Sequence, residues 1–242
     1  MLIRDKVAVV TGAAHRVGKA IAVGLAQQGA HVVVHYHQNR QLAEATAAEI
    51  RGLGRRAAAV GADLGTAAGV EALFAAARED FGPIDILVNS AAIMEAADPL
   101  TLGWDDWQRS LDVNLTGPFF CAQRAAQSMR ERGGAIVNIA DLAGLEPWAR
   151  YPAHSVSKAG LVMLTKVLAK AWAPSIRVNA VAPGPVAKPQ GFDDARWAAI
   201  GENTLLKHPG SGYDVAQAVS FLVSADYITG EILVVDGGAQ YV

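Results

Sequence analysis

The 242-residue chain has a single cysteine, Cys121, which excludes an internal disulfide. A lone cysteine favours a reduced, cytoplasmic setting and a place in the core. The net charge is −2 and no run of Lys or Arg occurs, so the basic footprint of a nucleic-acid-binding protein is missing. No apolar run reaches the roughly 18 residues of a membrane-spanning helix, and the N-terminus has no signal-peptide pattern. We therefore expect neither a membrane nor a nucleic-acid partner.

Apolar, β-branched runs alternate with amphipathic segments along the whole chain. The runs predict strands at 6–11, 30–36, 57–62, 84–90, 135–140, 176–182 and 231–236. Helices are predicted at 16–28, 40–53, 66–80, 104–132 with a bend near 117–118, 152–172, 193–206 and 213–224. This alternation predicts one α/β domain over residues 1–242, with a doubly wound parallel sheet and helices on both faces. Its ligand should lie at the strands' carboxyl ends, between the first and fourth strands.

The segment 11–18 joins the first strand to the first helix, which is the setting of a dinucleotide-binding loop. Gly12 permits a tight turn and Gly18 allows the helix to pack closely on the strand. The helix start at Val17 can then face phosphate. Arg16 occupies the middle glycine position of the usual pattern and could fork onto phosphate oxygens. A plain turn is the alternative interpretation.

The segment after the second strand contains no acidic residue, although proteins that prefer NAD usually carry one there. Tyr36 and His37 follow the strand, and His15, His37 and Arg40 are available to meet a 2′-phosphate. This pattern predicts NADP(H) as the cofactor, with a solvated polar loop as the alternative. No Cys/His or His/carboxylate spacing predicts a metal site.

A second cluster of ionisable residues lies between 141 and 158, where the fifth strand meets a long helix. His154 and Lys158 are four residues apart and therefore share one helix face. Asp141 follows the strand and can approach them. The segment predicts a catalytic corner at the carboxyl end of the sheet.

These features, taken in order, resemble the short-chain dehydrogenase/reductase family. The set is Thr11-Gly12-x-x-x-Arg16-x-Gly18, Asp63-Leu64, Asn89-Ser90-Ala91-Ala92, Asn114, the segment 141–158 and Pro183-Gly184. The resemblance implies a seven-stranded Rossmann fold, hydride transfer to or from a carbonyl or imine, and a homotetramer or homodimer. Pteridine reductases are the most similar members, because of Ala14-His15-Arg16, His35-Tyr36-His37 and an Asp rather than Ser at 141.

The same resemblance implies roles for individual residues. Asp63, followed by Leu64, would hold the adenine, and Lys158 would bind the nicotinamide ribose. Asn114 would hold a water in the proton relay. Asn89 would shape the floor of the cleft, and Ser90 and Ala91 after it would contact the cofactor. Pro183 and Gly184 would flank the nicotinamide ring.

The chain departs from the family at its acid, because His154 stands where the family has a tyrosine four residues before Lys158. Neutral imidazole is a poor acid, so His154 would have to act as imidazolium. Lys158 opposes that charge and Asp141 favours it. Tyr151, one turn earlier, is the alternative donor. Met94 occupies the place where pteridine reductases stack an aromatic ring on the pterin.

The sequence therefore predicts an NADPH-dependent oxidoreductase that transfers hydride to a small carbonyl or pterin-like substrate. Asp141, His154, Lys158 and Asn114 are the expected catalytic set. The alternative is a catalytically weak protein that binds the dinucleotide as a sensor or assembly partner.

Overall fold

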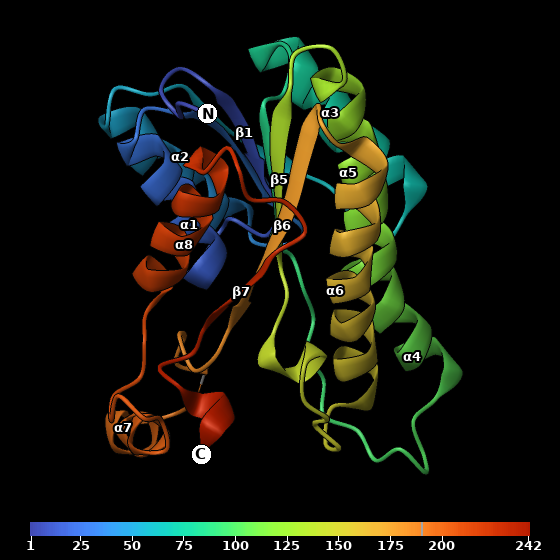
Figure 1. The fold of residues 1–242 in the computed structure, drawn as a ribbon, viewed down its shortest axis with the longest axis vertical. Helices are drawn as coiled ribbons and strands as arrows, with labels where there is room; N and C mark the ends of the chain where they lie inside the picture. The colour runs from blue at the N-terminus through green and yellow to red at the C-terminus, as the bar shows by residue number, and fades with distance from the viewer. Residues whose placement is uncertain (190) are drawn as a thin grey trace.

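The computed structural model describes residues 1–189 and 191–242, and its centre is a parallel sheet covered on both faces (Figure 1). Within these residues, seven strands run in the order β3-β2-β1-β4-β5-β6-β7. Their bounds are β1 Val7–Val10, β2 His31–Tyr36, β3 Ala57–Gly61, β4 Ile86–Asn89, β5 Gly134–Ile139, β6 Ile176–Pro183 and β7 Ile232–Val235. The predicted doubly wound fold is confirmed, and the strand order reverses between β1 and β4 as expected.

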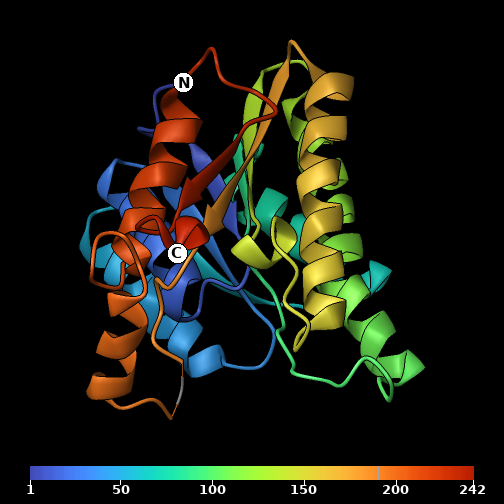
Figure 2. The same ribbon diagram turned by 60° about the horizontal axis from the view of Figure 1, so that its bottom comes forward.

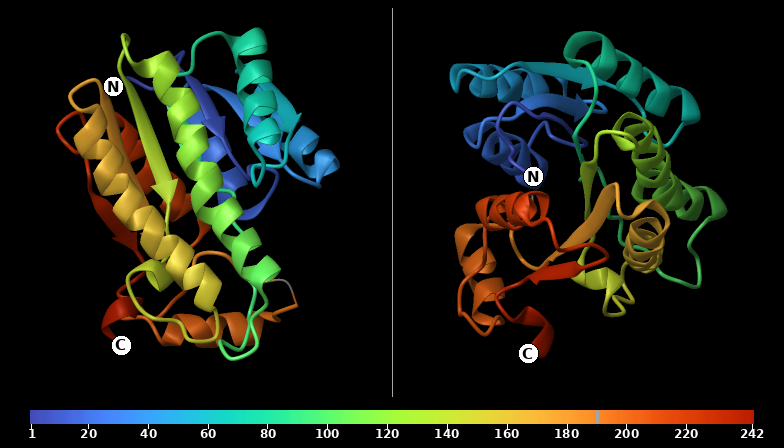
Figure 3. Two further views of the ribbon diagram at one scale, coloured as in Figure 1. Left: turned by 90° about the vertical axis from the view of Figure 1, so that its right-hand side faces the viewer. Right: turned by 45° about the horizontal axis from the view of Figure 1, so that its top comes forward.

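Two helical layers cover the sheet, as the right panel of Figure 3 shows. One layer holds α1 Arg16–Gln27, α2 Arg40–Gly52 and α8 Gly212–Ser224, and the other holds α3 Ala67–Phe81, α5 Gly117–Met129 and α6 Pro152–Trp172. Successive side chains of a strand point to opposite faces. Ala8 and Val10 accordingly pack into the first layer, and Val7 and Val9 pack into the second. The two cores therefore fix the position of each strand end.

The carboxyl ends of the strands meet at one edge of the sheet, at the bottom of Figure 1 and turned forward in Figure 2. A short 3-10 helix, Leu142–Gly144, follows β5 there. Helix α7, Asp194–Glu202, and the C-terminal 3-10 turn, Ala239–Tyr241, lie at the same edge. This edge is where the sequence places the ligand.

The predicted long helix over 104–132 is present as one continuous helical run over Trp104–Met129, with a π-helical turn close to the predicted bend. Helix α4, Trp104–Leu111, is followed by a π-helical turn at Asp112–Thr116, and α5 then begins at Gly117. A wider π turn inserts an extra residue and rotates the side chains that follow, and such turns often mark functional sites. The irregularity therefore lies just before the predicted bend.

Other features of the fold can be compared with the predictions from the sequence. Thr66 caps α3 as predicted, with its hydroxyl accepting the Gly69 N–H at 3.1 Å. Cys121 lies in the core, and burial raises the pKa of its thiol to about 12. Helix α7 is shorter than the predicted 193–206. Gln190, between β6 and α7, lies outside the described residues.

Among the residues that the structure describes, no helix is both long and apolar enough to cross a membrane.

Candidate active site

A cleft of about 360 Å³ opens beside the ends of β1, β2 and β4. It is lined by the predicted loop residues Gly12, His15, Arg16, Val17 and Gly18, by Tyr36 and His37, and by Asp63, Leu64, Ser90 and Ala91. Arg40 instead begins α2 and is not among the lining residues. Most of the residues predicted to hold the cofactor are therefore brought to one cleft.

The glycines of this loop stand where backbone approaches backbone. Gly12 has φ +64°, and a Cβ there would come within 2.8 Å of the Ala91 Cα. A Cβ on Gly18 would overlap the Gly12 carbonyl. Thr11 supports the other side, because its hydroxyl accepts the N–H groups of Ser90 at 2.9 Å and Ala91 at 3.0 Å.

The start of α1 is open to an anion. His15 precedes the helix without a side-chain cap, and the first turn carries no acid. Its free N–H groups and the helix dipole therefore favour phosphate. Arg16 adopts φ +52°, a left-handed conformation unusual for a residue with a side chain, and its Nη2 donates to the Ala187 carbonyl at 3.0 Å. The cradle and its charge fit a dinucleotide's phosphates.

The remaining predicted cofactor residues lie around the cleft rather than in its lining. Asn89, at the end of β4, is buried and donates to Asn138 Oδ1 at 2.9 Å and to the Pro118 carbonyl at 3.2 Å. It therefore shapes the cleft from beneath. Pro183 ends β6, and Gly184 donates its N–H to the Val235 carbonyl at 2.9 Å.

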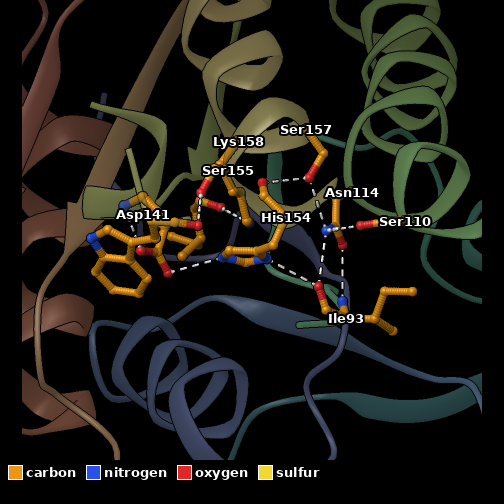
Figure 4. A network of polar contacts seen from close by, with 11 residues as sticks. Ile93, Ser110, Asn114, Asp141, His154, Ser155, Ser157 and Lys158 are labelled. Carbon is orange, nitrogen blue, oxygen red and sulfur yellow. Dashed lines mark hydrogen bonds and ion pairs between the residues drawn. The ribbon is translucent and has the colours of Figure 1, made fainter. Parts of the chain in front are cut away.

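Asp141, His154 and Lys158 come together as predicted, at the end of β5 and on the first turns of α6 (Figure 4). Asp141 precedes the 3-10 helix and accepts the Ala143 N–H at 2.9 Å through Oδ1. Its other oxygen, Oδ2, lies 3.4 Å from His154 Nε2. That separation is an ion-pair distance, but the two atoms do not meet hydrogen-bond geometry, so the contact is electrostatic.

Both ring nitrogens of His154 face oxygen atoms. Nδ1 lies 3.1 Å from the carbonyl of Ile93, which can only accept, so Nδ1 carries a proton. Nε2 faces the Asp141 carboxylate, where a bare nitrogen lone pair would be repelled. Both ring nitrogens therefore point at hydrogen-bond acceptors. The imidazole is 3% exposed and the Asp141 side chain is 24% exposed, so the carboxylate is the more open member of the pair.

Asn114 lies in the π-helical turn and holds Ile93 at both of its backbone polar atoms (Figure 4). Its Oδ1 accepts the Ile93 N–H at 2.8 Å, and its Nδ2 donates to the Ile93 carbonyl at 2.9 Å. Nδ2 also donates to Ser157 Oγ at 3.0 Å, and that hydroxyl donates to the His154 carbonyl at 2.7 Å. Asn114 thus holds in place the Ile93 carbonyl, which accepts the proton of His154 Nδ1.

Lys158 is buried behind this pair. Its Nζ donates to the Ile139 carbonyl at 2.6 Å. Burial lowers the pKa of Lys158 to about 8, and the nearby Asp141 carboxylate acts in the opposite direction.

Tyr151, the alternative donor, is placed differently. It caps the start of α6, and its ring packs against Trp148 at a centroid distance of 6.3 Å. The structure shows no hydrogen bond from its hydroxyl to another described residue. The geometry therefore joins His154, and not Tyr151, to Asp141.

Two contacts of the site could not be predicted from the sequence. The Ile93 carbonyl is a backbone group, and nothing in the residue type marks it as a partner of His154. Thr11 belongs to the loop pattern in the sequence. Its hydrogen bonds to the segment after β4, however, form only because β1 and β4 are neighbours in the sheet. In the described ranges, 1–189 and 191–242, no group of three or more His, Cys, Asp or Glu is placed to hold a metal ion.

Comparison with known proteins supplies the family. A family model described as Enoyl-(Acyl carrier protein) reductase matches residues 12–240. A short-chain type dehydrogenase/reductase of Picea abies is 36% identical over 249 residues, which cover 96% of this chain and 92% of that protein. The chain belongs to the short-chain dehydrogenase/reductase family. Other members that are similar to the chain are named for different activities, so the comparisons show the family and not the substrate.

Two further members illustrate this. The 3beta-hydroxysteroid dehydrogenase 1 of Eggerthella lenta is 39% identical over 245 residues, with 98% of this chain and 94% of that protein covered. The blue fluorescent protein from a metagenomic library, solved in complex with NADPH, superposes with a TM-score of 0.91 at 33% identity over 99% of both chains. This short-chain dehydrogenase/reductase is therefore an oxidoreductase of a family that uses NAD or NADP.

Proposed function

We propose that residues 1–242 form a single-domain NADPH-dependent reductase of a small carbonyl or pterin-like substrate, with His154 and Asp141 as its proton-donating pair. The observation that carries the proposal is the placement of both His154 nitrogens against oxygens, at 3.1 Å from the Ile93 carbonyl and 3.4 Å from Asp141 Oδ2. Reduction of a carbonyl needs a proton at oxygen as hydride reaches carbon, and an imidazolium can supply it near neutral pH.

A nicotinamide, when bound, would supply the hydride, and residues of the chain would supply the proton. Imidazole is shorter than a phenol, so Nε2 ends nearer α6 than a tyrosine hydroxyl would. Asp141 Oδ2 lies beside it and is the more exposed group. The proton therefore leaves His154 Nε2 on the side where Asp141 Oδ2 lies. The pair loses one positive charge in this step and regains its proton from solvent.

Lys158 and Asn114 support the pair without donating the substrate's proton. The buried ammonium of Lys158 adds positive charge near Asp141, which would stabilise an alkoxide-like oxygen that develops beside the pair. Asn114 holds the Ile93 carbonyl and thereby keeps one proton of His154 on Nδ1, so that the proton on Nε2 points toward Asp141. By resemblance, Lys158 would also bind the nicotinamide ribose.

Three features support NADPH over NADH. No acidic residue follows β2, whereas an acid there would repel a 2′-phosphate. His15 and His37 line the cleft at this end. Arg16 adds a guanidinium at the loop. A pterin-like substrate is supported only by the pteridine reductase-like sequence pattern, since Met94, which is 45% exposed, offers a thioether rather than an aromatic face.

We also propose that the protein is a homodimer or homotetramer. Apolar side chains are exposed on α5 and α6, at Phe120, Val156, Met163 and Val167. These helices are the pair through which members of the family usually associate. Sedimentation of the purified protein tests the assembly, and a monomer at micromolar concentration would contradict it.

Hydride transfer from NADPH to a panel of carbonyls, quinones and pterins tests the chemistry. His154→Ala should abolish turnover, His154→Tyr should retain it by restoring a phenol, and Tyr151→Phe should leave it unchanged. Loss of activity in Tyr151→Phe alone would overturn the assignment. Better use of NADH than of NADPH, by kcat/KM, would overturn the cofactor preference.

A second function is favoured by one observation, the burial of the acid. His154 is 3% exposed, and its Nε2, which faces Asp141, is buried without a hydrogen-bond partner. A protein that binds the dinucleotide but turns it over weakly, as a sensor or assembly partner, is consistent with that geometry. Tight NADPH binding without turnover across the panel would support this second function.

A further inference from the structure

His35 is a buried histidine at the end of β2 that the proposed proton transfer does not use. It is 2% exposed and belongs to the walls of the cofactor cleft. Its Nδ1 accepts the Gly12 N–H at 3.1 Å, and its Nε2 lies 3.1 Å from the Ala62 carbonyl. One ring therefore joins the ends of three neighbouring strands, β1, β2 and β3.

These two contacts define one protonation state. The Gly12 amide can only donate and the Ala62 carbonyl can only accept, so the ring is neutral with its proton on Nε2. Burial lowers the pKa of His35 to about 4, and the nearby His37 acts in the same direction. The Ala62 carbonyl and Asp63 oppose that shift.

The contact with Gly12 fixes the orientation of the glycine loop. The His35 carbonyl also accepts the Ala13 N–H at 2.9 Å, so two successive amides of the loop are turned inward onto one residue. Inward amides cannot bind phosphate. The amides left to face an anion are those at the start of α1, where no side chain caps the helix.

The Ala62 contact sets the other end of the cleft. Ala62 directly precedes Asp63, a residue of the cleft lining that the family resemblance assigns to the adenine. The Ala62 N–H donates to the Tyr36 carbonyl at 3.0 Å, so both backbone groups of Ala62 are held from the end of β2.

We propose that His35 is a positioning residue of the cofactor site, which aligns the phosphate-binding loop through Nδ1 and the adenine-binding strand end through Nε2. The inference rests on the proposed binding of NADPH and is independent of which residue donates the proton. His35 need not touch the cofactor, because it acts through Gly12 and Ala62.

The same strand offers a matched control. His31, at the opposite end of β2, accepts the Arg56 N–H at 3.1 Å through its Nδ1. The donor, the acceptor atom and the distance match those of the Gly12 contact, but His31 lies away from the cleft. Loss of this bond should cost stability without changing the affinity for cofactor.

The test measures Kd for NADPH by fluorescence titration in the wild-type protein and in His35→Leu, His35→Asn and His31→Leu, with Tm measured in parallel. His35→Leu leaves the Gly12 amide unpaired and should raise Kd about tenfold or more. Asn carries an acceptor near the position of Nδ1, so His35→Asn should bind within about threefold of wild type. His31→Leu should lower Tm and leave Kd unchanged. In His31→Leu, kcat at saturating NADPH should stay within about twofold of wild type.

Wild-type affinity in His35→Leu would overturn the proposal and leave His35 a purely structural residue. Equal losses in the Leu and Asn variants would also overturn it, because the Gly12 acceptor would then have no part. If the variants do not fold, nitrogen NMR of the wild-type imidazole decides, and a proton on Nδ1 at neutral pH would overturn the proposal. Failure of the proposed function gives a different result, a wild-type protein that binds NADPH but turns nothing over.

Discussion

The cofactor cleft and the catalytic corner differ in how they are built. The cleft is made mainly of backbone: glycines that permit close approach, uncapped amides at the start of α1, and strand ends held by His35. The corner depends on side chains, the pair His154 and Asp141 with Asn114 behind them. A family pattern therefore carries over to the cleft, while one substitution changes the chemistry of the corner. The comparison predicts that substitutions in the corner affect turnover and that those in the cleft affect binding.

The largest expected effect is that of Asp141→Asn. Without the carboxylate, Nε2 of His154 loses the charge that favours its protonation, so the acid is lost at neutral pH. We expect kcat to fall by about 10² to 10⁴-fold, the range of general acid catalysis, with Kd for NADPH unchanged. Asp5→Asn is the control, because this carboxylate pairs with Arg55 at 2.8 Å just before the start of β1, at the end of the strand opposite the site. Equal kcat in wild type and Asp141→Asn would remove the pair from the mechanism.

The next effect is that of Asn114→Leu. The Ile93 carbonyl loses its support, and the His154 ring loses its fixed orientation. A misplaced donor typically costs about 10²-fold in rate, and we expect a loss of kcat of that order. In a His154→Tyr background the same change should cost less, because a phenol makes no bond to the Ile93 carbonyl. A double-mutant cycle measures the difference, and strict additivity would contradict the proposed chain of contacts.

A third effect concerns stability and pH. Burial lowers the pKa of Lys158 to about 8, below its ordinary value of 10.5 in the unfolded chain. Between these values the unfolded state binds more protons, so this lysine makes the folded state more stable as pH rises, and below pH 8 its contribution is flat. We expect wild type to gain about 2 kcal/mol relative to Lys158→Met between pH 8 and pH 10. Denaturant titrations at both pH values measure it, and parallel curves would contradict the burial of a charged lysine.

The smallest effect lies in the cleft, at Arg16. Arg16→Gly removes a side chain from a residue at φ +52°, so we expect the free energy of unfolding to rise by about 1 kcal/mol. The same change removes a guanidinium from the phosphate loop and should raise KM for NADPH about tenfold while leaving kcat unchanged. Arg16→Lys separates charge from geometry. A variant that is neither more stable nor weaker in binding would contradict this account of the loop.

The sequence predicted the cleft well because its signals are backbone signals. Gly12 and Gly18 stand at positions of the strand–turn–helix where a Cβ would clash with the backbone. Their spacing can therefore be recognised in the sequence alone. The limits of α6, Pro152–Trp172, were predicted for a similar local reason, since proline begins a helix readily. The π-helical turn that places Asn114 was missed, because its extra residue is imposed by packing and not by composition.

The residues of the catalytic corner were predicted from the sequence, but their geometry was not. Spacing brought His154 and Lys158 to one helix face, yet it gave no sign that the Ile93 carbonyl would fix the ring. Nor did it show that Asp141 would be the exposed member of the pair. Contacts between a side chain and distant backbone depend on the complete fold, and that information is spread over the whole chain.

Nitrogen NMR of histidine-labelled protein, with His154→Ala to assign the resonance, tests the central claim most directly. We expect both nitrogens of His154 to carry protons at neutral pH in the wild type. In Asp141→Asn only Nδ1 should remain protonated, because the Ile93 carbonyl still accepts from it. A neutral ring in the wild type, with Nε2 unprotonated beside Asp141, would contradict the claim that this pair replaces the tyrosine of the family.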